Sequence, residues 1–321
     1  MRTLLLPTIF LLAVTSAGPS FSQSWPEQPV KIIVPFAPGG NSDSIARLIA
    51  QRFGAAFGQQ FVVENRAGAG GIIAAESVAR AAADGYTLLM GSPSQMTIAP
   101  VITKVPYDPV KDFAPIGVIG GNPLVLLAAA NVPANSAVEF IDYVRKRPGT
   151  LAYGTAGVGS IAHLTAAMFL KRAGLDMIAV TYKGGAPALA DVLAGRLTMY
   201  FANLSEALPY AKGGDVRLLA VTGESRTPQL PDVPTLGESG LAQFKSETWN
   251  GLLAPAGTSQ AIIDKLAAEI ARAVRDPDFT RRLYAIGVNP VGNKPSEFAA
   301  LITADTALWA QAAQWAGARA R

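Results

Sequence analysis

The chain has 321 residues, of which 50% are hydrophobic and 16% charged, so it can form sizeable cores and does not have the composition of a disordered chain. Cysteine is absent and histidine occurs once, which excludes a cysteine nucleophile, a disulfide, an iron–sulfur cluster and a multi-histidine zinc site. The net charge of +4 is too small for a nucleic-acid surface, although it is compatible with a small anionic ligand. At about 150 residues per domain, the length predicts two domains.

Residues 1–22 have the pattern of a secretory signal peptide. Arg2 supplies a positive start, an apolar run covers residues 4–14, and small residues lead to Ser22, after which we place the cleavage site. The apolar run is short of the roughly 20 residues that span a bilayer, which favours a cleaved signal over a membrane anchor. We therefore expect an exported, soluble mature chain.

The first half of the chain alternates between predicted strands and helices. Apolar runs predict strands at residues 30–34, 61–63 and 86–90. A helix with Ile45, Ile49 and Phe53 on one face follows the first strand, capped by Asn41, Ser42 or Asp43, and an alanine-rich helix follows the second through residue 83. This order predicts parallel strands with right-handed crossovers.

The second half continues in the same style, which predicts a second α/β domain. Ser136 with Glu139 forms a capping box for a helix that Pro148 ends, and a helix from Ile161 stops near Gly174. Further helices are expected at 187–194, from 259 onward, from Pro277, and at 296–315. Strands are expected at 124–127, 151–153, 177–181, 197–201, 218–221 and 249–254.

Two glycine-rich turns, at residues 38–43 (PGGNSD) and 154–160 (GTAGVGS), each follow a predicted strand and begin an amphipathic helix. A helix N-terminus offers free N–H groups and a partial positive charge, and glycine lets an anion approach the backbone closely. Two such turns, one per domain, could hold the two ends of a small acid. Each turn alone is also compatible with an ordinary connection of an α/β fold.

Residues 157–162 match the G-x-G-x-x-A fingerprint of dinucleotide-binding proteins, and Asp176 follows at a suitable distance. This pattern is the best argument for an enzyme, a dinucleotide-dependent oxidoreductase. The loop lies in the middle of the chain, however, and an exported protein meets no assured nicotinamide pool. A hydrolase is poorly supported, because His163 is the one available histidine base. His163 is interpreted either as a packed or capping residue or as a hydrogen-bond donor beside the site.

Blocks along nearly the whole mature chain resemble the Bug family, the extracytoplasmic solute-binding proteins of tripartite tricarboxylate transporters. Each block alone is weak, but together they are very specific. They include WPEQPV (25–30), VPFAPGG (34–40), VENRAGAGG (63–71), DGYTLL (84–89), PYDPVKDF (106–113), YGTAGVGS (153–160), LPDVPT (230–235) and WNGL (249–252).

The resemblance implies an α/β, two-lobed periplasmic-binding-protein fold, in which each lobe is a mostly parallel sheet flanked by helices and two crossover strands join the lobes. Domain I would comprise residues 23–122 and 246–321, and domain II residues 123–245. It implies a monomeric periplasmic protein, without catalysis, cofactor or metal, that captures a small organic carboxylate for the membrane subunits of a tripartite tricarboxylate transporter. A ligand-sensing partner of a membrane signalling protein remains an alternative.

In the family, the loop after the first strand and its second-domain counterpart hold a carboxylate, and further specificity is expected from strand ends that face the cleft. The family often has an acidic residue soon after the His-Leu pair, whereas residues 165–168 here are Thr-Ala-Ala-Met. This departure favours a plain organic acid over an amino acid. Carried over to this chain, the expected ligand-binding residues are Phe36, Pro38, Gly39, Gly40, Asn41, Ser42, Asp43, Ser92, Ser94, Gln95, Gly154, Thr155, Ala156, Gly157, Gly159, Ser160, His163 and Asn203.

Overall fold

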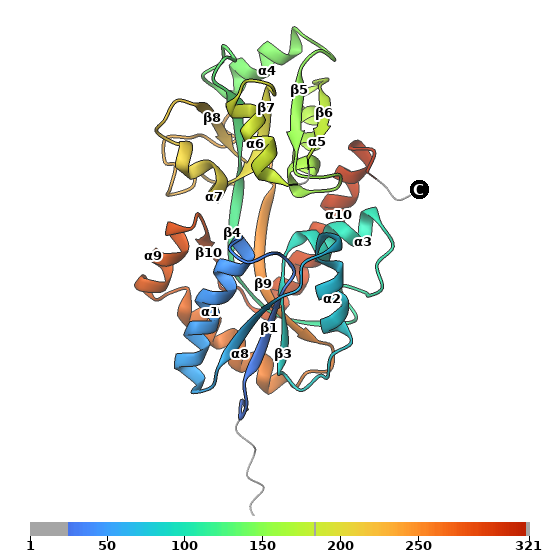
Figure 1. Ribbon diagram of the computed structural model, residues 1–321, viewed down its shortest axis with the longest axis vertical. Coiled ribbons are helices and arrows are strands. Elements are labelled where there is room, and N and C mark those ends of the chain that lie inside the picture. Colours follow the sequence, from blue (N-terminus) through green and yellow to red (C-terminus); the bar gives the residue numbers. More distant parts are fainter. Residues whose placement is uncertain (1–24, 183, 319–321) are drawn as a thin grey trace, which may run out of the picture.

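The computed structural model describes residues 25–182 and 184–318, and the expected signal peptide lies outside the described residues. The chain forms two lobes stacked along the long axis of the molecule (Figure 1). One sheet path runs through both lobes in the order β2-β1-β3-β9-β4-β7-β5-β6, and β8 and β10 also pair with β4. The expected two-lobed α/β fold is confirmed.

The first lobe is built on β1 (Val30–Val34), which pairs in parallel with β2 (Phe61–Asn65) and β3 (Thr87–Gly91). Ile32, Ile33 and Val34 are fully buried, as expected for an apolar strand that is covered on both faces. The helices of this lobe are α1 (Asn41–Phe57), α2 (Ile72–Ala79), α3 (Ala99–Ile102), α8 (Gln260–Ala273) and α9 (Pro277–Ala285), with short turns η1 (Ala69–Gly71) and η2 (Ser94–Ile98) and the short strand β10 (Asn289–Pro290).

The second lobe has its own parallel group, in which β5 (Ala152–Thr155) lies between β6 (Ile178–Thr181) and β7 (Met199–Asn203). Its helices are α4 (Ala137–Arg145), α5 (Ile161–Ala173), α6 (Gly185–Leu193) and α7 (Leu204–Ala207), followed by η3 (Leu208–Tyr210). Ser160 caps α5 and Gly174, at φ 64°, ends it, as the sequence predicts.

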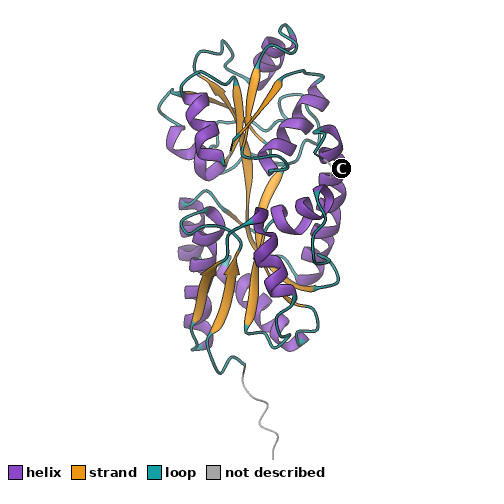
Figure 2. Cartoon of the chain, turned by 45° about the vertical axis from the view of Figure 1, so that its right-hand side comes forward, coloured by secondary structure: helices purple, strands orange, loops and turns teal. Residues whose placement is uncertain are grey.

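The lobes are joined by β4 (Phe113–Ala129) and β9 (Glu247–Pro255), which pass between them side by side (Figures 1 and 2). The first part of β4 pairs antiparallel with β9, and its second part pairs antiparallel with β7 and with β8 (Val216–Val221). Each lobe therefore contains a mixed sheet rather than a mostly parallel one. The strand predicted at 124–127 is only a part of the second half of β4. The prediction stopped short because prolines and glycines interrupt the apolar pattern of the first half, where the pairing with β9 also shifts register.

The last helix, α10 (Pro295–Trp315), forms a third connection between the lobes. Phe298 and Ile302 belong to a core of the first lobe, whereas Trp309, Ala312 and Ala313 belong to the core of the second. The expected domain assignment, which gives residues 246–321 to domain I, does not anticipate this contact. Within the described part of the chain, no helix has both the length and the apolar character needed to cross a membrane.

Candidate functional site

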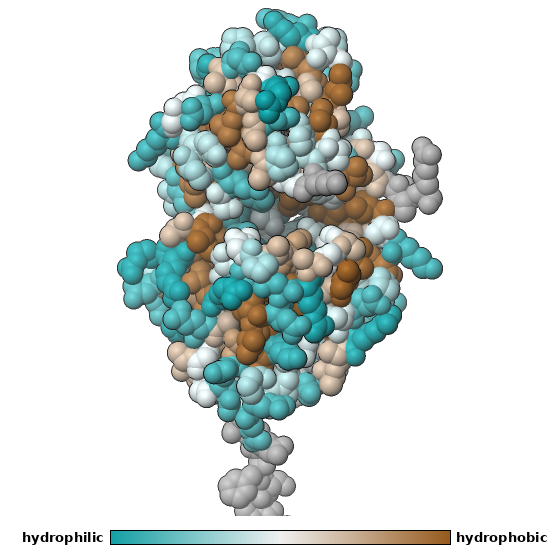
Figure 3. Space-filling model, viewed as in Figure 1, coloured by the Kyte–Doolittle hydropathy of each residue, from teal (hydrophilic) through white to brown (hydrophobic). Residues whose placement is uncertain are grey.

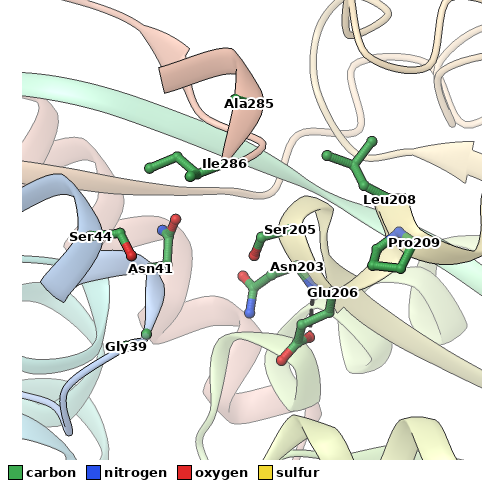
Figure 4. A pocket seen from close by; sticks show the side chains of 11 residues that line it. Gly39, Asn41, Ser44, Asn203, Ser205, Glu206, Leu208, Pro209, Ala285 and Ile286 are labelled. Atoms are coloured by element: carbon green, nitrogen blue, oxygen red, sulfur yellow. Dashed lines mark hydrogen bonds between the residues drawn. The ribbon is translucent and has the colours of Figure 1, made fainter. Parts of the chain in front are cut away.

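Two cavities lie between the lobes, where the space-filling surface narrows to a waist (Figure 3). The larger has a volume of about 680 Å³, and residues of the first lobe (Gly39, Gly40, Asn41, Ser44) and of the second (Asn203, Ser205, Glu206) line it (Figure 4). The smaller, of about 370 Å³, lies between Phe36 and Ser94 on one side and residues 156–160 on the other. The loop at residues 36–41 lines both cavities and is therefore the centre of the cleft.

The N-terminus of α1 opens into the larger cavity. Gly40 is the N-cap residue, with φ −78° and ψ 175°, and no described side chain caps the helix. The expectation that Asn41, Ser42 or Asp43 is the N-cap is wrong, because the helix already begins at Asn41. The first N–H groups of α1, which have no partner inside the helix, are therefore available to an anion, and the helix dipole favours negative charge there.

Asp43 shapes this loop from behind. Its buried carboxylate accepts hydrogen bonds from the Gly39 N–H (2.9 Å), from Arg47 Nε and Nη2 (2.9 and 3.0 Å) and from Asn65 Nδ2 (2.9 Å). Asn65 Nδ2 also donates to the Phe36 carbonyl. Burial alone would raise the pKa of Asp43, but these hydrogen bonds together hold it below its usual value. Asp43 thus positions the loop rather than presenting charge to a ligand.

The first turn of α1 is tied to both crossover strands. Asn41 Nδ2 donates to Asn122 Oδ1 on β4 (3.3 Å), and Ser42 Oγ donates to Asn250 Oδ1 on β9 (2.5 Å). Asn122 in turn donates to the Gly287 carbonyl. Buried Asn41 Oδ1 and Asn250 Nδ2 have no hydrogen-bond partner among the described residues. The candidate anion site is therefore coupled to the strands about which the lobes would move.

Sequence reasoning missed Asn122 and Asn250. Both asparagines are buried in the crossover strands, at 1% exposure each. A polar side chain in such a setting needs a partner, so its presence was a usable signal. Their partners on α1 could be identified only from the fold.

The second glycine loop uses much of its own hydrogen-bonding capacity. Gly157 N–H donates to Thr155 Oγ1 (3.4 Å), Gly159 N–H to His163 Nδ1 (3.1 Å) and Ser160 N–H to the Gly157 carbonyl (3.1 Å). Gly157 and Gly159 have φ values of 133° and 73°, where only glycine is unstrained. This loop therefore forms a wall of the smaller cavity whose N–H groups are partly used by its own hydrogen bonds. By comparison, the N-terminus of α1 has more N–H groups available to a ligand.

His163 is a capping residue of this loop, in agreement with one of the two interpretations from the sequence. The backbone N–H of His163 donates to Ser160 Oγ (3.2 Å), and its ring Nδ1 accepts from the Gly159 N–H (3.1 Å). Burial lowers the pKa of His163, which favours the neutral ring, whose Nδ1 can accept a hydrogen bond.

Several residues expected at the site do not line either cavity. Ser92 Oγ donates to Gln95 Oε1 (2.6 Å), and Gln95 Nε2 donates to the Met90 carbonyl (3.2 Å), so these buried side chains hold the turn into η2. Gly154 and Thr155 are buried at the end of β5. The expected residues that line a cavity are Phe36, Gly39, Gly40, Asn41, Ser94, Ala156, Gly157, Gly159, Ser160 and Asn203.

The wall contributed by α7 includes a carboxyl group that the sequence analysis did not identify. Glu206 Oε2 accepts from the Asn203 N–H (3.0 Å) and from Tyr200 Oη (3.4 Å). Burial raises the pKa of Glu206, although these hydrogen bonds oppose the shift. The signal was an Asn-x-x-Glu capping box directly after a predicted strand.

The dinucleotide fingerprint is not supported by the position of Asp176. The glycines at 157–159 follow the carboxyl end of β5, whereas Asp176 precedes β6 and its carbonyl accepts from the Gly149 N–H, before β5 begins. Since β5 and β6 are parallel, Asp176 and the glycine loop lie at opposite ends of the strands. An acidic residue that binds the ribose must lie at the same, carboxyl end of the strands as the loop.

Comparison with known proteins agrees with this geometry. A family model described as the tripartite tricarboxylate transporter family receptor matches residues 45–317. The chain belongs to this receptor family. A similar protein, BugT of Bordetella pertussis, is 33% identical to this chain over 320 residues, which cover 99% of this chain and 98% of BugT. The resemblance to the Bug family is thus confirmed.

Solved structures similar to this receptor-family chain include two with bound acids. R. palustris Rpa4515, solved with adipate, is 37% identical with a TM-score of 0.80, covering 91% of this chain and 98% of that one. MatC of Rhodopseudomonas palustris, solved with bound malate, is 34% identical with a TM-score of 0.77, covering 90% and 99% of the two chains. This chain therefore has the fold and the receptor class of solute-binding proteins.

Proposed function

We propose that this receptor captures a small organic carboxylate between its lobes. The observation that carries the proposal is the uncapped N-terminus of α1, which opens into a cavity between the lobes. The similar proteins solved with adipate and with malate support the same ligand class.

In this proposal, one carboxylate group of the ligand accepts hydrogen bonds from the N–H groups of residues 41–43. Charge-assisted hydrogen bonds of this kind contribute about 1.5–3 kcal/mol each. Asp43 keeps the loop in place through its bond to Gly39, and Asn41 and Ser42 connect the helix to β4 and β9. The second lobe then closes over the ligand, and the closed state is stabilised by its higher affinity for the acid.

The chain would release its ligand unchanged to the membrane subunits of a tripartite tricarboxylate transporter, from the periplasm and without catalysis. The receptor family supports the transport role. An N-terminal signal sequence, expected at residues 1–22, would account for export.

The experiment is a thermal-shift screen of carboxylic acids on ligand-free protein, followed by calorimetric titration of the acids that bind. A ligand at 100 times its dissociation constant stabilises the fold by about 2.7 kcal/mol. The same screen includes NAD and NADP. The proposal is contradicted if no acid in a broad panel raises the melting temperature, or if only the nicotinamide cofactors bind saturably.

A further inference from the structure

Glu206 is the one side chain with an ionisable group among the described residues that line the two cavities bordered by the loop at residues 36–41. The remaining lining consists of glycines, amides, hydroxyls and apolar side chains. Glu206 lies on the wall opposite Gly39 and Asn41, as Figure 4 shows. A ligand bound at the N-terminus of α1 therefore meets this carboxyl group across the larger cavity.

The capping role of Glu206 uses one of its two oxygens. Oε2 accepts from the Asn203 N–H and from Tyr200 Oη. The other oxygen, Oε1, lies beside Gly185 at the start of α6, where a Cβ atom would collide with it. Glycine at this position leaves room for the carboxyl group next to the cavity. A cap of α7 does not require the second oxygen.

We propose that Glu206 selects, among small acids, those that carry a hydrogen-bond donor, an ammonium or a hydroxyl group, on their carbon chain. This inference rests on the proposed function. An acid bound at α1 places the rest of its chain toward Glu206, where a donor group forms a charge-assisted hydrogen bond. A second carboxylate at the same place is disfavoured by like-charge repulsion, unless one of the two groups is protonated.

The inference revises the expectation of a plain organic acid. That expectation assumed that residues 165–168 face the ligand. Thr165 is instead fully buried within α5 and hydrogen-bonds to Ser246, and none of residues 165–168 lines either cavity. The acidic group of the cleft comes from α7.

The test compares acids of equal chain length by calorimetry on ligand-free protein: succinate, malate and aspartate, and then glutarate, 2-hydroxyglutarate and glutamate. Glu206→Gln is the central variant, because its amide oxygen can still accept from the Asn203 N–H. Glu139→Gln is the matched control, because Glu139 Oε2 accepts from the Asn135 N–H (2.7 Å) at the start of α4, much as Glu206 caps α7, and Glu139 lines neither cavity.

For at least one of the two chain lengths, the wild type is expected to bind the amino or hydroxy acid at least about tenfold more tightly than the unsubstituted diacid of the same length. Glu206→Gln should reduce this preference by about tenfold, more for an ammonium than for a hydroxyl ligand, while Glu139→Gln leaves it unchanged. The inference is overturned if the wild type binds the plain diacids as tightly as their substituted counterparts, or if Glu206→Gln leaves the preference intact. If the wild type binds no acid at all, the proposed function itself fails.

Discussion

Gly40→Leu tests the anion site at α1 without disturbing the backbone. Gly40 has φ −78° and ψ 175°, which any residue adopts, and a Cβ there would lie 3.7 Å from the nearest atom, the Ala37 carbonyl oxygen. Leucine is a poorer N-cap than glycine, at a cost of about 1 kcal/mol, so the melting temperature should fall by about 2–4 °C.

The effect on binding should be much larger than the effect on stability. A leucine side chain at the cavity wall would occupy the space in front of the N–H groups of residues 41–43. Loss of two charge-assisted hydrogen bonds, at about 1.5–3 kcal/mol each, weakens binding by at least about a hundredfold.

Calorimetric titration with an acid from the screen measures this effect. Ser136→Leu is the control, because Ser136 is the N-cap of α4, at the far end of the second lobe (Figure 1). It should lower the melting temperature by a similar amount and leave the dissociation constant unchanged. If Gly40→Leu binds as tightly as the wild type, or if Ser136→Leu weakens binding equally, the acid does not bind at the N-terminus of α1.

Three further predictions concern the walls of the cleft. Gly159→Ala should weaken binding, because its Cβ would overlap Ile102 of the first lobe. Adding Ile102→Ala should restore the affinity but not the stability lost to the positive φ, about 1–2 kcal/mol. If calorimetric titration shows no recovery of affinity in the double variant, this overlap is not the cause of weaker binding. Because the folded-state pKa of His163 is depressed, the unfolded chain takes up a proton more readily than the folded chain as the pH falls. The stability that neutral His163 contributes is therefore complete above about pH 6.5 and is lost as the pH falls through the folded pKa. Between pH 7.5 and 5, the melting temperature of His163→Gln should fall less than that of the wild type, and an equal fall would show that His163 does not contribute to the pH dependence. Asp43→Asn should lower the urea midpoint and weaken binding together, because one amide cannot accept from Gly39, Arg47 and Asn65 at once; unchanged affinity would show that the loop does not need this anchor.

Elements with strong local signals were predictable from the sequence. The apolar run of β1, the amphipathic face of α1 and the Ser160 and Gly174 caps of α5 depend on residues close together in the chain. The first half of β4 was not predictable in this way, since its prolines and glycines are tolerated only because β9 pairs with it across two register shifts.

The site was predictable in part for the same reason. The two glycine loops are local features, and both line a cavity. Glu206, Asn122 and Asn250 reach the cleft through the topology of β7, β4 and β9. Nothing in the sequence pairs the two asparagines with α1 or places Glu206 across a cavity from it. Ser92 and Gln95 stand at a strand end as expected, but their mutual hydrogen bond turns them away from the cleft.

A crystal structure of the protein with a bound acid from the screen would show where the carboxylate binds. We expect a carboxylate group in the larger cavity, within hydrogen-bond distance of the N–H groups of residues 41–43, with the second lobe closed over it. A ligand bound elsewhere, with the N-terminus of α1 free of any anion, would contradict carboxylate capture at α1.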